Sequence, residues 1–191
     1  MEERISRMET EENSSGKKNM VREIAGMVIY IAVLAAAVFL INTFVFQRTV
    51  VDGMSMYPTL EDGDNLIADK ISYRFTDPKR FDIIVFPYKQ EEHTYFIKRI
   101  IGLPGETIQI EDGTIYIDGQ ELDEDYGRET ILDAGDAGEP ITLGEDEYFV
   151  MGDNRNNSED SRHNGMGLVD SDRIVGKLWF TISPWKKIGF V

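Results

Sequence analysis

The sequence contains one long apolar segment, which lies near its N-terminus. Residues 24–47 include no formally charged side chain and are mostly Ile, Val, Ala, Leu and Phe. At 1.5 Å per residue a helix over this segment is about 36 Å long, enough to cross a lipid bilayer with some tilt. The segment is too long for the apolar part of a cleavable targeting peptide and lacks the small-residue cleavage motif. We therefore expect a permanent transmembrane helix over residues 24–47; a helix buried in a protein core is the alternative.

The charges on either side of this segment are asymmetric. Arg48 is the one basic residue that follows it closely, whereas five precede it: Arg4, Arg7, Lys17, Lys18 and Arg22. Positive charge favours the cytoplasmic side of a membrane. The pattern predicts a cytoplasmic tail over residues 1–23 and an extracytoplasmic domain over residues 48–191. The tail is polar without an apolar period, which predicts disorder.

Composition excludes several classes of function. The net charge is −15, and residues 48–191 hold 15 basic and 29 acidic side chains, so binding to nucleic acid through its phosphates is not expected. The chain has no cysteine, which removes thiol nucleophiles, disulfides and Cys-ligated zinc. We interpret the acidity as a solvated surface, with attraction of a basic partner as the alternative.

Beyond the apolar segment, the pattern is that of short strands. Turn residues separate apolar or alternating runs at 65–68, 81–87, 94–101, 107–110, 114–117, 147–151, 174–180 and 188–191. The Asp112-Gly113 pair between two alternating runs predicts a β-hairpin. Residues 120–143 are rich in Gly, Pro and acidic side chains, so we expect a loosely structured part of an insertion over about 111–146. The predicted fold is mainly β, an antiparallel sheet or barrel-like domain after one membrane helix.

A serine lies in an unusual setting just after the apolar segment. Ser55 stands between two methionines, with Gly53 two residues before it and Pro58 three residues after it. Glycine and proline both fix special backbone conformations, as in a turn that holds one hydroxyl in place. The alternative is a simple connection between the membrane helix and the domain.

A lysine interrupts one of the apolar strands. Phe96, Lys98 and Ile100 share a face of the predicted strand, because alternate side chains point the same way. Burial disfavours the ammonium ion and lowers a lysine pKa, so Lys98 could act as a general base for a serine hydroxyl. The alternative is a lysine that reaches solvent or pairs with a carboxylate.

A polar loop is predicted over residues 151–162. Its Asp153, Asp160 and Arg162 could form an ion-pair network around the hydroxyl of Ser158. A turn rich in Asp and Asn, or a calcium loop, is the alternative. The spacing lacks the glycine that the helix-flanked calcium loop requires, so no metal site is predicted.

Together these features resemble the type I signal peptidase family, in its short Gram-positive-like form with one membrane span. Four stretches match in the family's order, namely residues 53–60, 80–86, 96–106 and 152–162. The resemblance implies a serine endopeptidase of the cell membrane that needs no cofactor. It would cleave secretory preproteins after small residues at −1 and −3, close to the secretion translocon and the lipid bilayer.

The resemblance also implies roles for individual residues. Ser55 would be the nucleophile, with its backbone N–H in the oxyanion hole, and Lys98 the general base of a Ser–Lys dyad. Ser158 would orient the lysine amine. Asp153, Asp160 and Arg162 would support the site, and Val51, Met56 and Ile97 would line the substrate pocket.

The sequence departs from the family at three positions. Gly53 replaces a serine whose hydroxyl serves the oxyanion hole in many relatives, although glycine is common in the single-span form. Phe81 replaces a usual glycine, and Glu106 a usual aspartate.

Two other functions remain alternatives. A protease using His163 with Asp153 or Asp160 is one, but Ser55 lacks the Gly-x-Ser-x-Gly elbow. A membrane-anchored β-domain that binds without catalysis is the other. The aromatic tail with Trp179 and Trp185 is expected either to pack in the core or to lie at a membrane surface.

Overall fold

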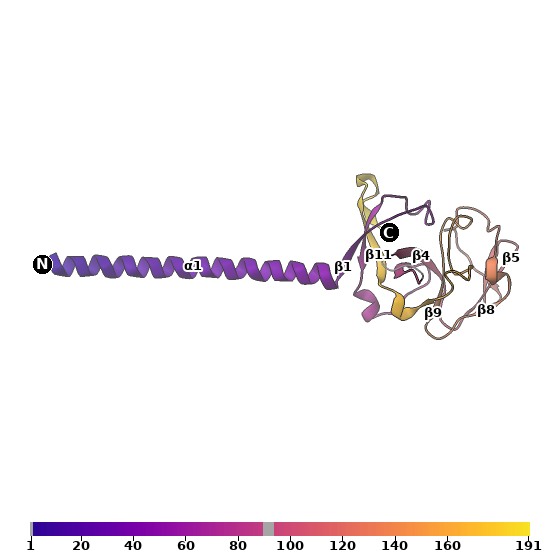
Figure 1. Cartoon of the computed structure of the whole chain (residues 1–191), viewed down its shortest axis with the longest axis horizontal. Helices are drawn as coiled ribbons and strands as arrows, with labels where there is room; N and C mark the ends of the chain where they lie inside the picture. The colour runs from indigo at the N-terminus through magenta and orange to yellow at the C-terminus, as the bar shows by residue number, and fades with distance from the viewer. Residues whose placement is uncertain (1, 90–93) are drawn as a thin grey trace. The chain divides into compact units, whose positions relative to one another are not determined.

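The computed structural model describes residues 2–89 and 94–191 and divides into two units, Met1–Phe44 and Val45–Val191. The first unit is helix α1, Glu2–Phe44 (Figure 1). Its segment Arg22–Ile41 is long and apolar enough to cross a membrane. The apolar helix predicted from the sequence is therefore present.

Helix α1 begins well before the apolar segment. The sequence predicted a disordered tail, whereas residues 2–23 are helical in the structure. Glu, Arg, Met and Lys dominate this part of the chain, and all four have high intrinsic helix propensity. A helix started by the apolar segment can therefore continue through them without an apolar face.

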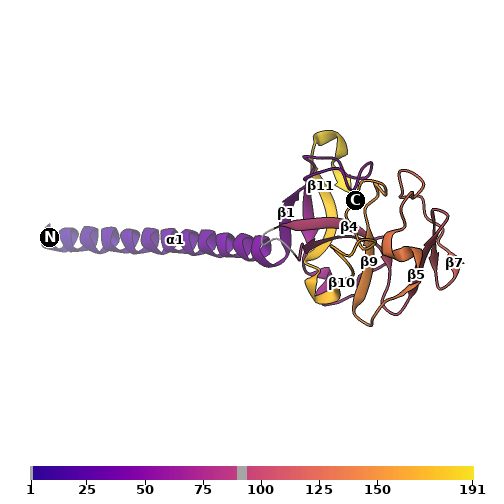
Figure 2. The same cartoon turned by 45° about the vertical axis from the view of Figure 1, so that its right-hand side comes forward.

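The second unit consists of short strands and 3-10 helical turns: β1 (Phe46–Val50), β2 (Asn65–Asp69), η1 (Ser72–Arg74), β3 (Ile83–Pro87), β4 (Tyr95–Gly102), β5 (Thr107–Glu111), β6 (Thr114–Ile117), β7 (Gln120–Glu121), η2 (Gly135–Gly138), β8 (Ile141–Thr142), β9 (Glu147–Met151), β10 (Val169–Asp170), η3 (Ser171–Arg173), β11 (Gly176–Ser183), η4 (Trp185–Lys187) and β12 (Gly189–Phe190). The larger sheet has the order β1-β2-β11-β3-β4-β9-β10, with β12 paired to β11, and the smaller has the order β7-β6-β5-β8. In Figure 2, β5 and β7 lie beyond β9 when viewed from β4. The predicted class, mainly antiparallel β, is confirmed.

Alternating side chains explain how strand β3 is buried on both faces. Ile83 and Val85 pack into one core cluster with Val51 and Met56, whereas the intervening Ile84 belongs to a second cluster. The predicted hairpin is also present as β5 and β6, joined by Asp112 and Gly113, both with positive φ. Two positive φ angles are what a tight hairpin turn with right-handed strand twist requires.

The insertion is more ordered than predicted. Within residues 120–143 the chain adds β7 and β8 to the smaller sheet and buries Ile131, Ala137 and Leu143 against it. Isolated apolar residues among Gly and Asp give no strand period, although they are enough to close a small core.

The start of β3 also differs. Phe81 has φ 73, so the strand begins at Ile83, two residues later than expected. Glycine adopts a positive φ at no steric cost, which explains why the family that this sequence resembles usually has glycine at this position.

The aromatic tail lies largely outside the core. Trp185 is 77% exposed and Phe190 75%, and Trp179 is half exposed. Trp179 stacks on Phe46 of β1 with ring centroids 5.7 Å apart. Core packing therefore does not describe Trp185.

Candidate active site

The loop after β1 holds Ser55 by anchoring its neighbours. Val51, Met56 and Leu60 are buried in the core cluster beneath the larger sheet, whereas Ser55 is half-buried. Gly53 has φ 99, a conformation that L side chains rarely adopt. Its N–H donates to the Asp62 carboxylate at 2.9 Å. The turn predicted around the serine is therefore present, and it presents a hydroxyl on a fixed backbone.

Lys98 lies in the middle of β4 and reaches this serine. Its side chain is buried, with the residue 3% exposed, and its Nζ lies 2.7 Å from Ser55 Oγ. The Nζ also lies 5.0 Å from the centre of the Phe96 ring, as expected for residues that share a strand face. The sequence placed the lysine in an apolar strand, and the fold brings it to the serine across 43 positions of chain.

Burial lowers the pKa of Lys98 to about 8, against the opposing effect of the carboxylates of Asp160, Glu159 and Asp153. Removal from water penalises the ammonium ion more than these carboxylates stabilise it. At pH 7 roughly one Lys98 in ten is then neutral and able to accept a proton.

In the loop after β9, Asp153 and Asp160 form separate ion pairs rather than one network. The carboxylate of Asp153 accepts two hydrogen bonds from the Arg99 guanidinium, at 2.8 and 2.6 Å, and one from the Thr59 hydroxyl. Asp160 accepts two from Arg162, at 2.8 and 2.9 Å. Both carboxylates are fully buried. The predicted pairing of Asp160 with Arg162 is present, whereas Asp153 pairs with the residue next to Lys98.

The same loop forms hydrogen bonds with the backbone around Ser55. The Asn154 side-chain amide donates to the carbonyl of Met54, and its backbone N–H donates to the carbonyl of Ser55, both at 3.0 Å. Gly152 lies so close that a Cβ there would overlap the Ser55 carbonyl oxygen and the Ser158 hydroxyl. Sequence reasoning missed Arg99 and Asn154. The one signal in the sequence was Arg99 itself, a second charged residue in the apolar strand that holds Lys98.

Ser158 and His163 have no direct bond to the dyad. The Ser158 hydroxyl is buried and has no hydrogen-bond partner among the described residues. His163 faces Asp160, with Nδ1 3.9 Å from its carboxylate. The hydroxyl of Ser55 is hydrogen-bonded to Lys98 instead. The geometry thus favours lysine over histidine as the proton acceptor.

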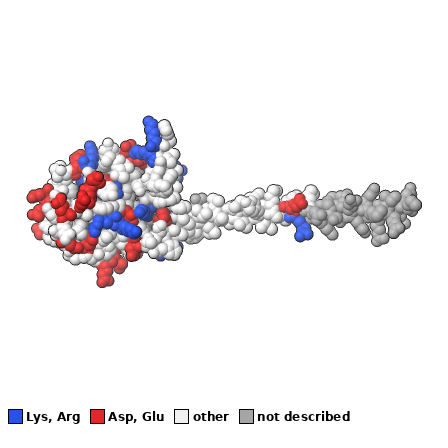
Figure 3. Space-filling model, turned by 180° about the vertical axis from the view of Figure 1, so that it is seen from behind, with Lys and Arg blue, Asp and Glu red and all other residues white. Residues whose placement is uncertain are grey.

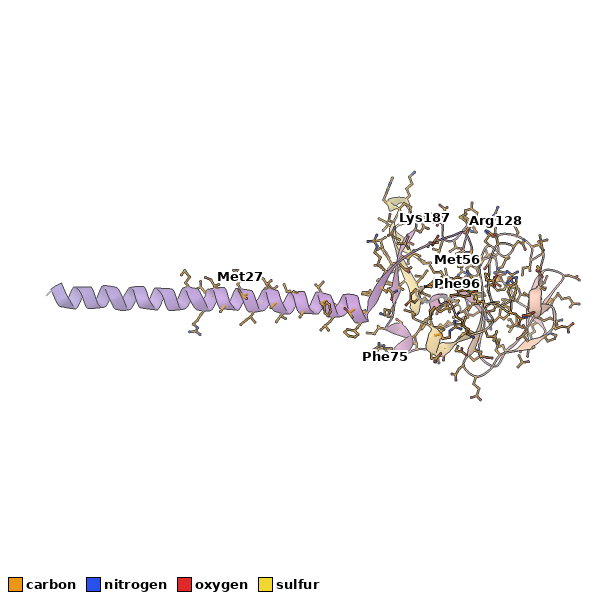
Figure 4. All side chains as sticks on the ribbon, in the orientation of Figure 1. Met27, Met56, Phe75, Phe96, Arg128 and Lys187 are labelled. Atoms are coloured by element: carbon orange, nitrogen blue, oxygen red, sulfur yellow. The ribbon has the colours of Figure 1, made fainter. Side chains whose placement is uncertain are left out.

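A cleft of about 500 Å³ contains the serine and the lysine. The three positions predicted to line a substrate pocket, Val51, Met56 and Ile97, all border it. Phe96 also lines the cleft, and Figure 4 labels both Phe96 and Met56 in the second unit. Its walls are residues 49–56, residues 94–98 and, from the loop after β9, Asn157 and Glu159.

Residues 23–185 match the family model described as Signal peptidase, peptidase S26. Signal peptidase I of Bacillus licheniformis is 41% identical over 187 residues, covering 94% of this chain and 97% of that protein. Signal peptidase I T of Bacillus subtilis (strain 168) is 41% identical, covering 94% of each chain. A solved signal peptidase I from Enterococcus faecalis V583 is 38% identical, with a TM-score of 0.44, and covers 54% of this chain and 97% of its own. The chain therefore belongs to the type I signal peptidase family, peptidase S26.

Proposed function

We propose that this protein is a membrane-anchored serine endopeptidase that removes signal peptides from secretory preproteins with a Ser55–Lys98 dyad. The main support is the 2.7 Å contact between Lys98 Nζ and Ser55 Oγ, in surroundings that lower the lysine pKa to about 8. A hydroxyl and a largely desolvated amine at hydrogen-bond distance are the two groups that acyl transfer requires.

The reaction proceeds in two halves. The Ser55 hydroxyl gives its proton to neutral Lys98 as its oxygen attacks the scissile carbonyl. The ammonium ion then protonates the departing amine, and the acyl group remains on Ser55 as an ester. Lys98 next takes a proton from water, which attacks the ester and releases the carboxylate, and returns the proton to the Ser55 oxygen.

The oxyanion is stabilised by the backbone N–H of Ser55. This N–H forms no hydrogen bond with another residue of the described chain and so remains available for a ligand. Gly53 offers no side-chain donor, and its own N–H is already bonded to Asp62. One donor of this kind typically contributes about 3 kcal/mol to transition-state stabilisation.

The substrate binds as an extended strand in the cleft. β4 pairs with β3 along Tyr95–Arg99, but its pairing with β9 begins only at Arg99. The outer edge of Tyr95–Lys98 is therefore left for an added strand, a common mode of peptide recognition. Val51, Met56 and Ile97 then restrict the −1 and −3 side chains to small ones. The Ser158 hydroxyl does not hold the lysine amine in this structure, and the ion pairs of Asp153 and Asp160 hold the loop behind it.

The protein lies in the cell membrane as a single-pass protein. Arg22–Ile41 spans the bilayer, the basic flank stays in the cytoplasm, and the β unit lies outside, near the secretion translocon. Tail, span and catalytic domain correspond to residues 1–23, 24–47 and 48–191. This arrangement suits a substrate whose apolar signal peptide leaves the same bilayer.

The test is preprotein cleavage by the detergent-solubilised full chain. We expect Ser55→Ala and Lys98→Ala to abolish product formation, and His163→Ala to leave the rate within about threefold of wild type, because His163 contacts neither reacting atom. Activity retained by Lys98→Ala, or lost in His163→Ala with an intact fold, would exclude the dyad.

A further inference from the structure

A short segment of the insertion contacts two elements of the active site. Residues 124–128, which we call the covering segment, lie between β7 and η2 outside any strand or helix. The sequence predicted a loose loop here. In the structure the covering segment contacts the loop after β9 and strand β4, the two elements that form hydrogen bonds with Ser55 and its neighbours.

Glu124 is a buried carboxylate in the covering segment. Figure 3 shows acidic side chains over much of one face of the second unit, but the Glu124 side chain is only 10% exposed. Its two oxygens accept hydrogen bonds from the two terminal nitrogens of Arg155, at 2.7 and 2.9 Å. The Arg155 side chain is 2% exposed. A guanidinium and a carboxylate joined by two parallel hydrogen bonds fix each other's orientation.

Arg155 connects this carboxylate to the residue that packs against the nucleophile. Its Nε donates to the carbonyl of Gly152 at 3.1 Å. Gly152 lies so close to the Ser55 carbonyl oxygen that a Cβ would overlap it. Gly127 of the covering segment lies against the same guanidinium, where a Cβ would come within 3.3 Å of the central carbon. The position of Gly152 therefore depends on the Glu124–Arg155 pair.

Tyr126 makes a second contact, with the strand that holds Lys98. Its ring covers the guanidinium of Arg99, whose central carbon lies 3.7 Å from the ring centre. Arg99 is next to Lys98 in β4 and pairs with Asp153 of the loop after β9. The backbone N–H of Arg128 donates to the Asp153 carbonyl at 2.9 Å. The covering segment thus contacts both partners of the ion pair that joins β4 to this loop.

We propose that Glu124 and Tyr126 are positioning residues for the cleavage of preproteins, an inference that rests on the proposed function. Glu124 acts through Arg155 and Tyr126 acts through Arg99, and together they fix the loop after β9 against the dyad. Neither side chain is among the described residues that line the cleft of the dyad. Their removal therefore lowers the rate of the chemical step and leaves substrate binding unchanged.

The first test is preprotein cleavage by the full chain in detergent, with rates expressed per folded molecule. We expect Glu124→Ala to lower kcat about 30-fold and to leave KM within about twofold, because small displacements of reacting groups are costly. The matched control is Asp125→Ala, which removes the exposed carboxylate next in the chain and should keep kcat within about twofold. A wild-type kcat in Glu124→Ala, or an equal loss in Asp125→Ala, would overturn the proposal.

Conservative variants separate positioning from general stability. Tyr126→Phe keeps the ring over Arg99 and should keep kcat within about twofold, whereas Tyr126→Leu should lower it about tenfold. This pair decides if Glu124→Ala does not fold, and equal rates in the two would contradict the proposal. Because Glu124 acts through Arg155, the double variant Glu124→Ala/Arg155→Ala should be no slower than the slower single variant. Multiplied losses would show that the two act independently.

Hydrogen exchange tests the loop without reference to activity. In Glu124→Ala we expect the backbone N–H of Asn154, which donates to the Ser55 carbonyl, to exchange at least about tenfold faster. The N–H groups of β2 should keep their wild-type rates. Unchanged exchange at Asn154, or equal acceleration in β2, would overturn the proposal. A wild-type chain that cleaves no preprotein would refute the proposed function, and exchange would still decide whether Glu124 holds the loop.

Discussion

The protonation of Lys98 should control the pH dependence of catalysis. In the proposed mechanism only the neutral amine accepts the Ser55 proton, and burial lowers its pKa to about 8. We expect the cleavage rate to rise about tenfold per pH unit below that value and to level off above it. The carboxylate of Glu159 raises this pKa, so Glu159→Gln should move the profile to lower pH. Initial rates between pH 6 and pH 10 provide the measurement.

The matched control for this profile is Glu139→Gln, which removes another exposed carboxylate, next to η2. A profile that shifts as much in Glu139→Gln as in Glu159→Gln would show a general surface effect. The lowered pKa of Lys98 also makes the free energy of unfolding depend on pH, in a direction that can be derived. Between about pH 8 and pH 10.5 the unfolded chain binds the lysine proton and the folded chain does not. The free energy of unfolding therefore rises with pH in that window.

Asn154 should position the nucleophile without touching the substrate. Its side-chain amide donates to the carbonyl of Met54, directly before Ser55. We expect Asn154→Ala to lower kcat about 10²-fold through misplacement of the hydroxyl, with KM and the pH profile little changed. Asn156→Ala is the control, because that amide donates to Thr130 and Glu129 instead. Equal rates in the two variants would contradict the positioning role.

At the scale of elements, the loop after β9 works through close packing against the serine loop. A side chain at Gly152 would overlap both the Ser55 carbonyl and the Ser158 hydroxyl. We expect Gly152→Ala to destabilise the fold by about 1–3 kcal/mol and to lower kcat further than the loss of folded protein explains. Thermal unfolding and preprotein cleavage provide the measurements. Gly138→Ala, whose Cβ would make only an ordinary contact with Ala134, should change neither; a wild-type kcat in Gly152→Ala would refute the argument.

The hairpin of β11, η4 and β12 should lie at the membrane surface. Trp185 and Phe190 are mostly exposed, and Trp179 stacks on Phe46, two residues beyond the end of α1. Tryptophan favours the interface between lipid and water. In Trp179→Phe protein reconstituted in liposomes, we expect brominated lipids to quench Trp185 fluorescence. Trp185→Phe, which leaves Trp179, reports the less exposed ring. Quenching of Trp185 by aqueous iodide but not by lipid would place the hairpin in solvent.

At the scale of the whole molecule, local pattern predicted the elements but not how distant ones meet. The hairpin at Asp112-Gly113 and the lysine within an apolar strand follow from neighbouring residues alone. The Ser55–Lys98 contact spans 43 positions, so only resemblance to a family could suggest it. The pairing of Arg99 with Asp153 depends on β4 and β9 lying side by side, which no local signal encodes.

The remaining differences have the same origin. The buried residues of the insertion are scattered among glycines and acidic side chains, so their burial depends on closure of the smaller sheet. The positive φ of Phe81 depends on tertiary contacts, including an aromatic contact with Tyr126 at 5.0 Å. A bulky residue adopts a positive φ only where contacts with its surroundings offset the steric strain.

We expect the two units to have separable roles, with the first unit as membrane anchor and the second as catalytic domain. Val45–Val191 has its own buried clusters and both sheets, so we expect a protein of residues 45–191 to unfold cooperatively in thermal scans. It should hydrolyse a soluble signal-sequence peptide at a rate within about threefold of the full chain in detergent. On a preprotein in liposomes it should be at least about 10²-fold slower, because the anchor no longer concentrates enzyme and substrate at one bilayer. The Ser55→Ala form of the same fragment defines the background. Equal rates of the fragment and the full chain on liposomes would show that α1 contributes nothing to substrate encounter.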